Sequence, residues 1–192
     1  MKKAILVHGW DGTPETGWFP WLAKELEGKG FEVVAPQLPE SGAPRIEKWV
    51  PTLASCAGTV DEHTYFVGHS LGCQTIARYL ETLPNGVTVG GVVYVAGFFK
   101  RLTNLEGPEA EALAEPWLQY PPNLTSVKAH SPKTIAFFSD DDPWVPLDNT
   151  NDFAERLDSE IIIKHGMSHF NEGAGYLELP IVLDAVLKLA QS

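Results

Sequence analysis

Short, continuously apolar runs alternate along the chain with stretches whose apolar residues recur at helical spacing. The runs predict strands, because a strand that is buried on both faces is apolar at every position. The stretches between them predict helices that end at glycine or begin near proline. The predicted strands cover residues 4–9, 31–38, 64–69, 90–98, 133–139 and 160–166, and the predicted helices cover residues 18–30, 45–58, 71–80, 147–158 and 179–191.

Three residues refine these helices. Pro51 must kink its helix or start a new turn there, because proline cannot donate a backbone hydrogen bond. Asp148 is the predicted N-cap of the helix at residues 147–158. Pro180 lies near the first turn of the last helix, where proline is tolerated. One face of that last helix is apolar and consists of Ile181, Val182, Ala185, Val186 and Leu189.

The alternation of strands and helices is typical of an α/β fold, in which a parallel sheet carries helices on both faces. Residues 99–131 do not follow this alternation. They are rich in Pro, Glu and Ala and are predicted as an irregular insertion. A chain of 192 residues that is 44% apolar and 20% charged suits one globular domain. We therefore expect residues 1–192 to form a single domain whose ligand site lies at the carboxyl ends of the strands.

The charge and the apolar runs argue against several partners. A net charge of −11 repels phosphate backbones and anionic lipids, so nucleic acid and membrane surfaces are not expected partners. Only about four apolar residues precede His8, fewer than the roughly 7–15 of a signal peptide. No run approaches the roughly 18 apolar residues of a membrane span. With two cysteines, Cys56 and Cys73, no disulfide framework is expected, and the sequence predicts a cytoplasmic protein.

The strand at 64–69 runs directly into a helix through GHSLG (68–72), a G-x-S-x-G pattern. At a strand-to-helix junction with no spare residue, this pattern is the nucleophile elbow, whose strained turn projects the serine away from the sheet. Glycine at 68 and 72 leaves room for the strand and the helix to approach each other. Ser70 is therefore the predicted nucleophile, and the alternative is a serine that caps the helix.

A serine nucleophile needs a base, and an acidic group must orient that base. In hydrolases with this elbow the chain order is Ser, then Asp or Glu, then His. His169, in the loop after the strand at 160–166, is the predicted base, and His165, which closes that strand, is the alternative. His130 precedes a strand and would lie at the wrong end of the sheet. His69 should point back into the sheet and pack there.

Three aspartates follow the strand at 133–139, at the expected edge of the sheet and in the expected chain order. The two prolines of DDDPWVP (140–146) stiffen this loop, and the first of them biases Asp142 toward an extended backbone. Asp142 is therefore the predicted acid of the triad. Asp140 and Asp141 have no comparable constraint and are predicted as ordinary turn or cap residues.

Acyl transfer also requires backbone N–H donors where the oxyanion develops. The predicted pair is the N–H of Leu71, directly after the nucleophile, and the N–H of Trp10 in the loop HGWDG (8–12). Side chains near these loops should wall a substrate pocket, although core packing is the alternative role of each aromatic ring. The predicted pocket residues are His8, Trp10, Phe98, Trp117, Tyr120, Trp144 and Phe170.

No cofactor or metal is expected. A calcium loop requires acids at alternate positions and a glycine, whereas the aspartate segment has Pro143 and Trp144 at those positions. The glycine patterns that bind dinucleotides or nucleoside triphosphates do not occur in the sequence.

The segments LVHGW, GHSLG, DDPWVP and SHF resemble the small α/β-hydrolases related to retinoblastoma-binding protein 9 and similar small bacterial serine hydrolases. The resemblance runs nearly end to end, through WFPWLAKEL and RIEKWVPTL. It implies a compact α/β-hydrolase fold of about six parallel strands in the order 2-1-3-4-5-6, with a triad of Ser70, Asp142 and His169. The L-x-C-x-E segment associated with retinoblastoma pocket binding is absent, so no such partner is expected.

Together these residues predict a serine hydrolase that acts through an acyl-enzyme on small carboxylic esters. Its expected partner is a small-molecule acyl substrate. Residues 99–131 are too few for a large lid, which argues against a lipase that works at an interface. Two alternatives stay open: an amidase or aminoacyl-ester hydrolase with the same triad, and a binding protein that retains an inactive site.

Overall fold

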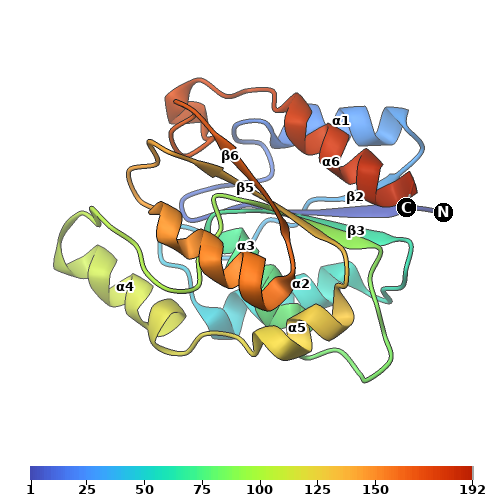
Figure 1. Cartoon of the computed structure of the whole chain (residues 1–192), viewed down its shortest axis with the longest axis horizontal. Coiled ribbons are helices and arrows are strands. Elements are labelled where there is room, and N and C mark those ends of the chain that lie inside the picture. The colour runs from blue at the N-terminus through green and yellow to red at the C-terminus, as the bar shows by residue number, and fades with distance from the viewer. Residues whose placement is uncertain (192) are drawn as a thin grey trace.

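A six-stranded parallel sheet in the order β2-β1-β3-β4-β5-β6 forms the centre of the computed structural model, which describes residues 1–191 (Figure 1). Both the strand order and the parallel pairing agree with the α/β-hydrolase prediction. The six predicted strands are all present, and most are shorter than their apolar runs. They are β1 (Lys3–Val7), β2 (Glu32–Val34), β3 (Thr64–His69), β4 (Gly91–Val95), β5 (Thr134–Ser139) and β6 (Glu160–Lys164).

Helices cover both faces of the sheet (Figure 1). On one face α1 (Phe19–Gly28) and α6 (Pro180–Gln191) pack over a core cluster that includes Leu22, Leu26, Val182 and Val186. On the other face lie α2 (Ile46–Ala57), α3 (Leu71–Leu80) and α5 (Leu124–His130), over a second cluster that includes Trp49, Phe66, Ile76 and Val127. Burial on both faces explains why the four central strands are largely apolar, whereas the edge strands β2 and β6 contain no fully buried residue.

The prediction of an irregular segment at residues 99–131 is wrong, because this segment contains two helices. These are α5 and α4 (Gly107–Gln119). Of the α4 side chains only Ala114 and Trp117 are buried, so the helix lacks the apolar stripe that sequence periodicity detects. α5 is seven residues long and is capped by Asn123, whose side chain accepts hydrogen bonds from two backbone N–H groups.

The helix predicted at residues 147–158 is present but distorted. It consists of a 3₁₀ turn, η1 (Leu147–Asn149), followed by a π-helical turn, η2 (Asp152–Arg156). The prediction of Asp148 as its N-cap is wrong, because that carboxylate makes an ion pair with Arg101 instead. The buried Asn149 side chain explains the tight first turn, since it binds the backbone of residues 99–101 and of Pro146.

The remaining helices follow the sequence closely. α2 continues through Pro51, whose ring is exposed, and α6 begins at Pro180 as predicted. None of the described helices is both long and apolar enough to cross a bilayer. Because the strands are parallel, the loops after β1, β3, β5 and β6 meet at one edge of the sheet. These loops carry the predicted triad residues and the predicted oxyanion donors.

Candidate active site

Ser70 occupies the sharp turn between β3 and α3. Its backbone angles, φ 52° and ψ −119°, are strained for a non-glycine residue. A Cβ added at Gly72 would lie 2.2 Å from the carbonyl oxygen of Val7, so only glycine allows α3 to approach β1 here. A Cβ at Gly68 would likewise lie 2.7 Å from the Cδ1 atom of Ile76. The elbow geometry is therefore present. The Ser70 side chain makes no capping hydrogen bond, which disfavours the helix-cap alternative.

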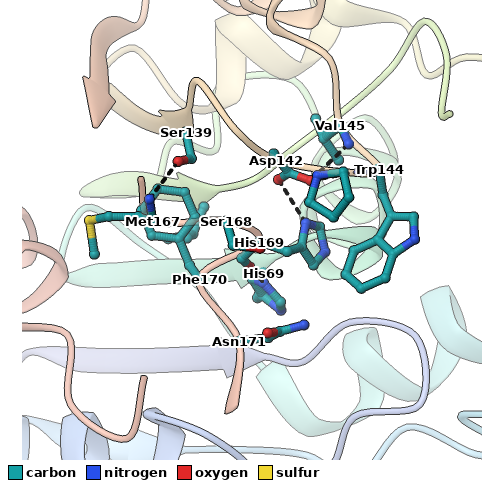
Figure 2. Close-up of polar contacts among 12 residues, drawn as sticks. His69, Ser139, Asp142, Trp144, Val145, Met167, Ser168, His169, Phe170 and Asn171 are labelled. Atoms are coloured by element: carbon teal, nitrogen blue, oxygen red, sulfur yellow. Dashed lines mark hydrogen bonds and ion pairs between the residues drawn. The ribbon is translucent and has the colours of Figure 1, made fainter. Parts of the chain in front are cut away.

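Asp142 and His169 form a buried pair at the same edge of the sheet (Figure 2). The His169 Nδ1 atom lies 2.8 Å from the Asp142 Oδ2 atom, and the exposed fractions of the two side chains are 8% and 1%. The other carboxylate oxygen, Oδ1, accepts hydrogen bonds from the backbone N–H groups of Trp144 and Val145, at 2.9 and 3.0 Å. Both carboxylate oxygens are thus held, and Nε2 is the His169 nitrogen left for proton transfer.

Ser70 and His169 line the same cavity. Within residues 1–191 the Ser70 hydroxyl makes no hydrogen bond, and such nucleophile–base contacts are often long before substrate binds. The indole of Trp144 packs edge-on against the His169 ring, with the ring centroids 5.0 Å apart (Figure 2). This contact covers the base on the side of the Asp142 loop.

The alternative base, His165, is poorly placed for catalysis. Its side chain is 90% exposed, and its Nδ1 atom lies 2.5 Å from the Asp140 Oδ2 atom. That hydrogen bond is the main cause that holds the pKa of Asp140 below its usual range. His130 lies at the other end of the sheet, as predicted, where its Nδ1 atom is bonded to the carbonyl of Val87. The geometry therefore favours His169 as the base.

Two further histidines lie beside the site: His8 is buried, and His69 is partly exposed and lines the cavity. His69 donates its Nε2–H to the carbonyl oxygen of His169 at 2.8 Å, and burial lowers the pKa of His69 to about 3. His8 donates from Nδ1 to the carbonyl of Gly9, and its Nε2 accepts from the backbone of Leu38. Burial also lowers the pKa of His8. Both rings are therefore neutral and structural at neutral pH, and the contact of His69 with residue 169 was not expected from the sequence.

The two predicted oxyanion donors lie at this edge of the sheet. Trp10 and Leu71 both line the cavity that contains Ser70. Across the described residues 1–191, neither of their backbone N–H groups makes a hydrogen bond to another protein group. The Trp10 indole donates to the carbonyl of Gly42, which fixes the loop after β1. Two unpaired N–H groups beside a serine hydroxyl are the arrangement that an oxyanion requires.

The cavity has a volume of about 690 Å³ and an apolar wall. Four of the predicted pocket residues line it: His8, Trp10, Phe98 and Trp144. The sequence did not identify Leu102, Leu105 and Leu113, which the segment before α4 and α4 itself contribute to the wall. Four acids, Asp11, Glu106, Glu109 and Glu172, also line the cavity, and no Lys or Arg is among its described lining residues.

Three predicted pocket residues lie elsewhere. Trp117 is buried in the core against Trp49, where its indole donates to the carbonyl of Pro44. Phe170 is buried in the cluster beneath α1 and α6. Tyr120 is 65% exposed and does not line the cavity. Core packing, the alternative that the sequence left open for aromatic residues, is thus the role of Trp117 and Phe170.

No group of three or more His, Cys, Asp or Glu side chains in the described part of the chain is arranged to hold a metal ion. The three consecutive aspartates each bind a different protein partner instead of converging.

Comparisons with known proteins identify the family. The family model described as Serine hydrolase matches residues 4–188. YdeN of Bacillus subtilis strain 168 is 33% identical over 186 residues, which cover 96% of this chain and 94% of YdeN. Its crystal structure has a TM-score of 0.91 over the full length of both chains. Serine hydrolase RBBP9 of Rattus norvegicus is 29% identical over 188 residues, which cover 96% of this chain and 95% of that protein.

A more distant structure shares only the fold. The esterase RhEst1 from a Rhodococcus species superimposes with a TM-score of 0.71 at 17% identity, covering 100% of this chain and 90% of that one.

Proposed function

The chain belongs to the serine hydrolase family, and on that premise we propose that it hydrolyses small carboxylic esters through Ser70, His169 and Asp142. The observation that carries the proposal is the buried pair between His169 and Asp142, which lies at the same cavity as a serine in a strained elbow. Nucleophile, acid and base then occur in the chain order of α/β-hydrolases.

The proposed reaction has two halves. In the first, the Ser70 oxygen bonds to the acyl carbon while His169 Nε2 takes the hydroxyl proton. The negative oxygen of the tetrahedral intermediate accepts hydrogen bonds from the N–H groups of Trp10 and Leu71. The bond to the leaving group then breaks, and His169 gives its proton to the departing alcohol.

In the second half, water replaces the alcohol. His169 takes a proton from water, the resulting hydroxide attacks the acyl carbon, and the bond to Ser70 breaks as the serine recovers its proton. Asp142 keeps the Nδ1–H tautomer of His169 and stabilises the imidazolium that forms in each half.

The cavity supports a substrate of modest size with an apolar group. Its volume of about 690 Å³ suits a small molecule, and Phe98, Leu113 and Trp144 give it an apolar wall. The ester preference itself rests on this shape and on the triad, since a fold that many esterases share does not determine a substrate.

A second candidate function has one specific observation in its favour. The four acids of the cavity lining, with no Lys or Arg among the described lining residues, would attract a substrate that carries a positive charge. Aminoacyl esters or amides with a free ammonium group fit this description.

A fluorophosphonate probe tests the proposed nucleophile. We expect stoichiometric labelling of the wild-type protein, none of Ser70→Ala, and unchanged labelling of Ser126→Ala, a serine on α5 far from the elbow in sequence. Labelling that persists in Ser70→Ala would refute the assignment. A folded wild-type protein that resists the probe would support the inactive binding protein instead.

Matched substrates separate the two enzymatic candidates. Turnover of p-nitrophenyl butyrate tests the ester activity. A phenylalanine ester compared with its N-acetyl derivative tests the effect of the positive charge, which acetylation removes. We expect turnover of the butyrate ester. A kcat/KM value that is much higher for the free-amine ester than for the acetylated one would favour the aminoacyl function, and activity on amides alone would overturn the ester proposal.

A further inference from the structure

The loop that carries His169 adopts an unfavourable backbone conformation. Ser168 and Phe170 have positive φ angles of 47° and 53°, although neither is glycine, and Gly166 has a φ of 67°. Non-glycine residues adopt this left-handed region only when the surrounding contacts hold them there. Contacts on each side of His169 must therefore stabilise this backbone conformation.

Ser139 and Asp141, three residues and one residue before Asp142, supply the contacts on the N-terminal side of His169. The Asp141 Oδ1 atom accepts a hydrogen bond from the backbone N–H of Ser168 at 2.7 Å. The Ser139 hydroxyl accepts from the N–H of Met167 at 2.9 Å and donates to Asp141 Oδ1 at 2.6 Å (Figure 2 shows the contact with Met167). One hydroxyl and one carboxylate thus bind two successive N–H groups immediately before His169.

Ser139 is held rigidly, because it is buried and is the last residue of β5. The far side of the loop is held separately, since His69 donates to the carbonyl of His169 and Trp18 donates its indole N–H to the carbonyl of Phe170 at 2.8 Å. Asp140 binds farther from the base, through the N–H of Gly166 and the exposed His165. The contacts nearest to the base on its N-terminal side are therefore those of Ser139 and Asp141.

We propose that Asp141 and Ser139 are positioning residues, which hold the loop so that the His169 imidazole meets both Asp142 and Ser70. The proposal rests on the proposed function of the triad. It replaces the sequence-based prediction that Asp141 is an ordinary loop residue. Neither residue touches the substrate in this scheme; both act through the backbone at residues 167 and 168.

Substitution of Asp141 tests the proposal. In Asp141→Ala the N–H of Ser168 loses its acceptor, and we expect kcat to fall by about 10- to 100-fold with KM changed by less than about twofold, because a small misplacement of a base costs this much. Asp141→Asn retains an oxygen acceptor for the same N–H and should recover most of the rate. Ser139→Ala should lower kcat in the same way.

The matched control is Asp61→Ala. The Asp61 Oδ1 atom also accepts from a backbone N–H, that of His63, and from a hydroxyl, that of Thr64, but it lies at the amino end of β3. Its loss removes the same kinds of bond away from the site, so kcat should stay at the wild-type value even if the melting temperature falls.

A second readout does not depend on turnover. The proton NMR signal of the His169 Nδ1–H reports its bond to Asp142, and we expect this signal to shift or broaden in Asp141→Ala and to stay unchanged in Asp61→Ala. A wild-type kcat together with a wild-type signal in Asp141→Ala would overturn the proposal.

If circular dichroism shows Asp141→Ala to be unfolded, Ser139→Ala, which removes one hydroxyl, decides in its place. If the wild-type protein resists the fluorophosphonate probe, the triad function fails, while the NMR comparison still decides whether Asp141 positions His169.

Discussion

At the scale of single residues, three adjacent aspartates each bind a different partner. Asp140 binds the exposed His165, Asp141 binds the backbone of Ser168, and Asp142 binds the side chain of His169. What separates them is burial: Asp142 is the one whose side chain is almost fully enclosed, and its second oxygen is also bound by two backbone N–H groups. Position in the loop therefore decides which carboxylate can orient the base.

Those two backbone N–H groups determine what Asp142→Asn would do. Because they require an oxygen acceptor, the asparagine must direct its carbonyl to them and its NH₂ group to His169 Nδ1. This would force the proton of the imidazole onto Nε2, the nitrogen that has to accept the proton of Ser70. We expect kcat for p-nitrophenyl butyrate to fall by about 10⁴-fold, as the loss of the correct tautomer does in other serine hydrolases.

The control for that substitution is Asp140→Asn in the same loop, whose partner His165 is exposed. We expect its kcat to stay within about threefold of the wild-type value, since exposed ion pairs contribute little. Equal losses in the two variants would contradict the assignment of Asp142 as the acid of the triad.

At the scale of elements, the sequence predicted what depends on local patterns. The strands are short apolar runs, so all six were recognisable, and the loops that follow them include Ser70, Asp142 and His169. α4 was not recognisable because only two of its side chains, Ala114 and Trp117, are buried. The role of an aromatic ring depends on distant packing partners, so the sequence could not distinguish Trp144 at the cavity from Trp117 in the core.

The junction of β3 and α3 depends on the absence of a side chain at Gly72. A Cβ there would lie 2.2 Å from the Val7 oxygen and 2.6 Å from the His8 oxygen, both of which are backbone atoms that cannot rotate away. We expect Gly72→Ala to lower the free energy of unfolding by roughly 3 kcal/mol or more, as measured by urea denaturation, since overpacking against backbone leaves no cheap relaxation.

Gly28→Ala is the matched control, because a Cβ at the end of α1 would meet no atom within 4 Å. Alanine is the better helix former, so this variant should keep or raise the free energy of unfolding, by up to about 1 kcal/mol. A Gly72→Ala protein as stable as the wild type would mean that β1 and α3 can separate without cost.

At the scale of the whole molecule, an acidic chain contains two neutral imidazoles beside the candidate site. The net charge is −11, yet His8 and His69 lie beside the site, where desolvation lowers the pKa of both. A histidine that is kept neutral in the folded protein and becomes protonated in the unfolded chain makes folding dependent on pH. This dependence lies in the range just below neutrality, where most carboxylates are still charged.

His69 makes the folded protein less stable as the pH is lowered. Its folded pKa is about 3 and its ordinary value is 6.5, so between these two pH values the unfolded chain binds one proton more than the folded protein. The free energy of unfolding should therefore fall as the pH is lowered through 6.5 and continue to fall toward 3. At about 1.4 kcal/mol for each pH unit, the contribution of His69 between pH 7 and pH 5 is a loss of about 2 kcal/mol.

Urea denaturation of the wild type and of His69→Gln at both pH values isolates this contribution. Glutamine can still donate a hydrogen bond to the carbonyl of His169 but does not titrate, while His8 and the acidic residues are common to both proteins and cancel. We expect the wild type to lose about 2 kcal/mol more than the variant on going from pH 7 to pH 5. Equal losses would contradict this, because they would show that His69 binds a proton in the folded protein as readily as in the unfolded chain.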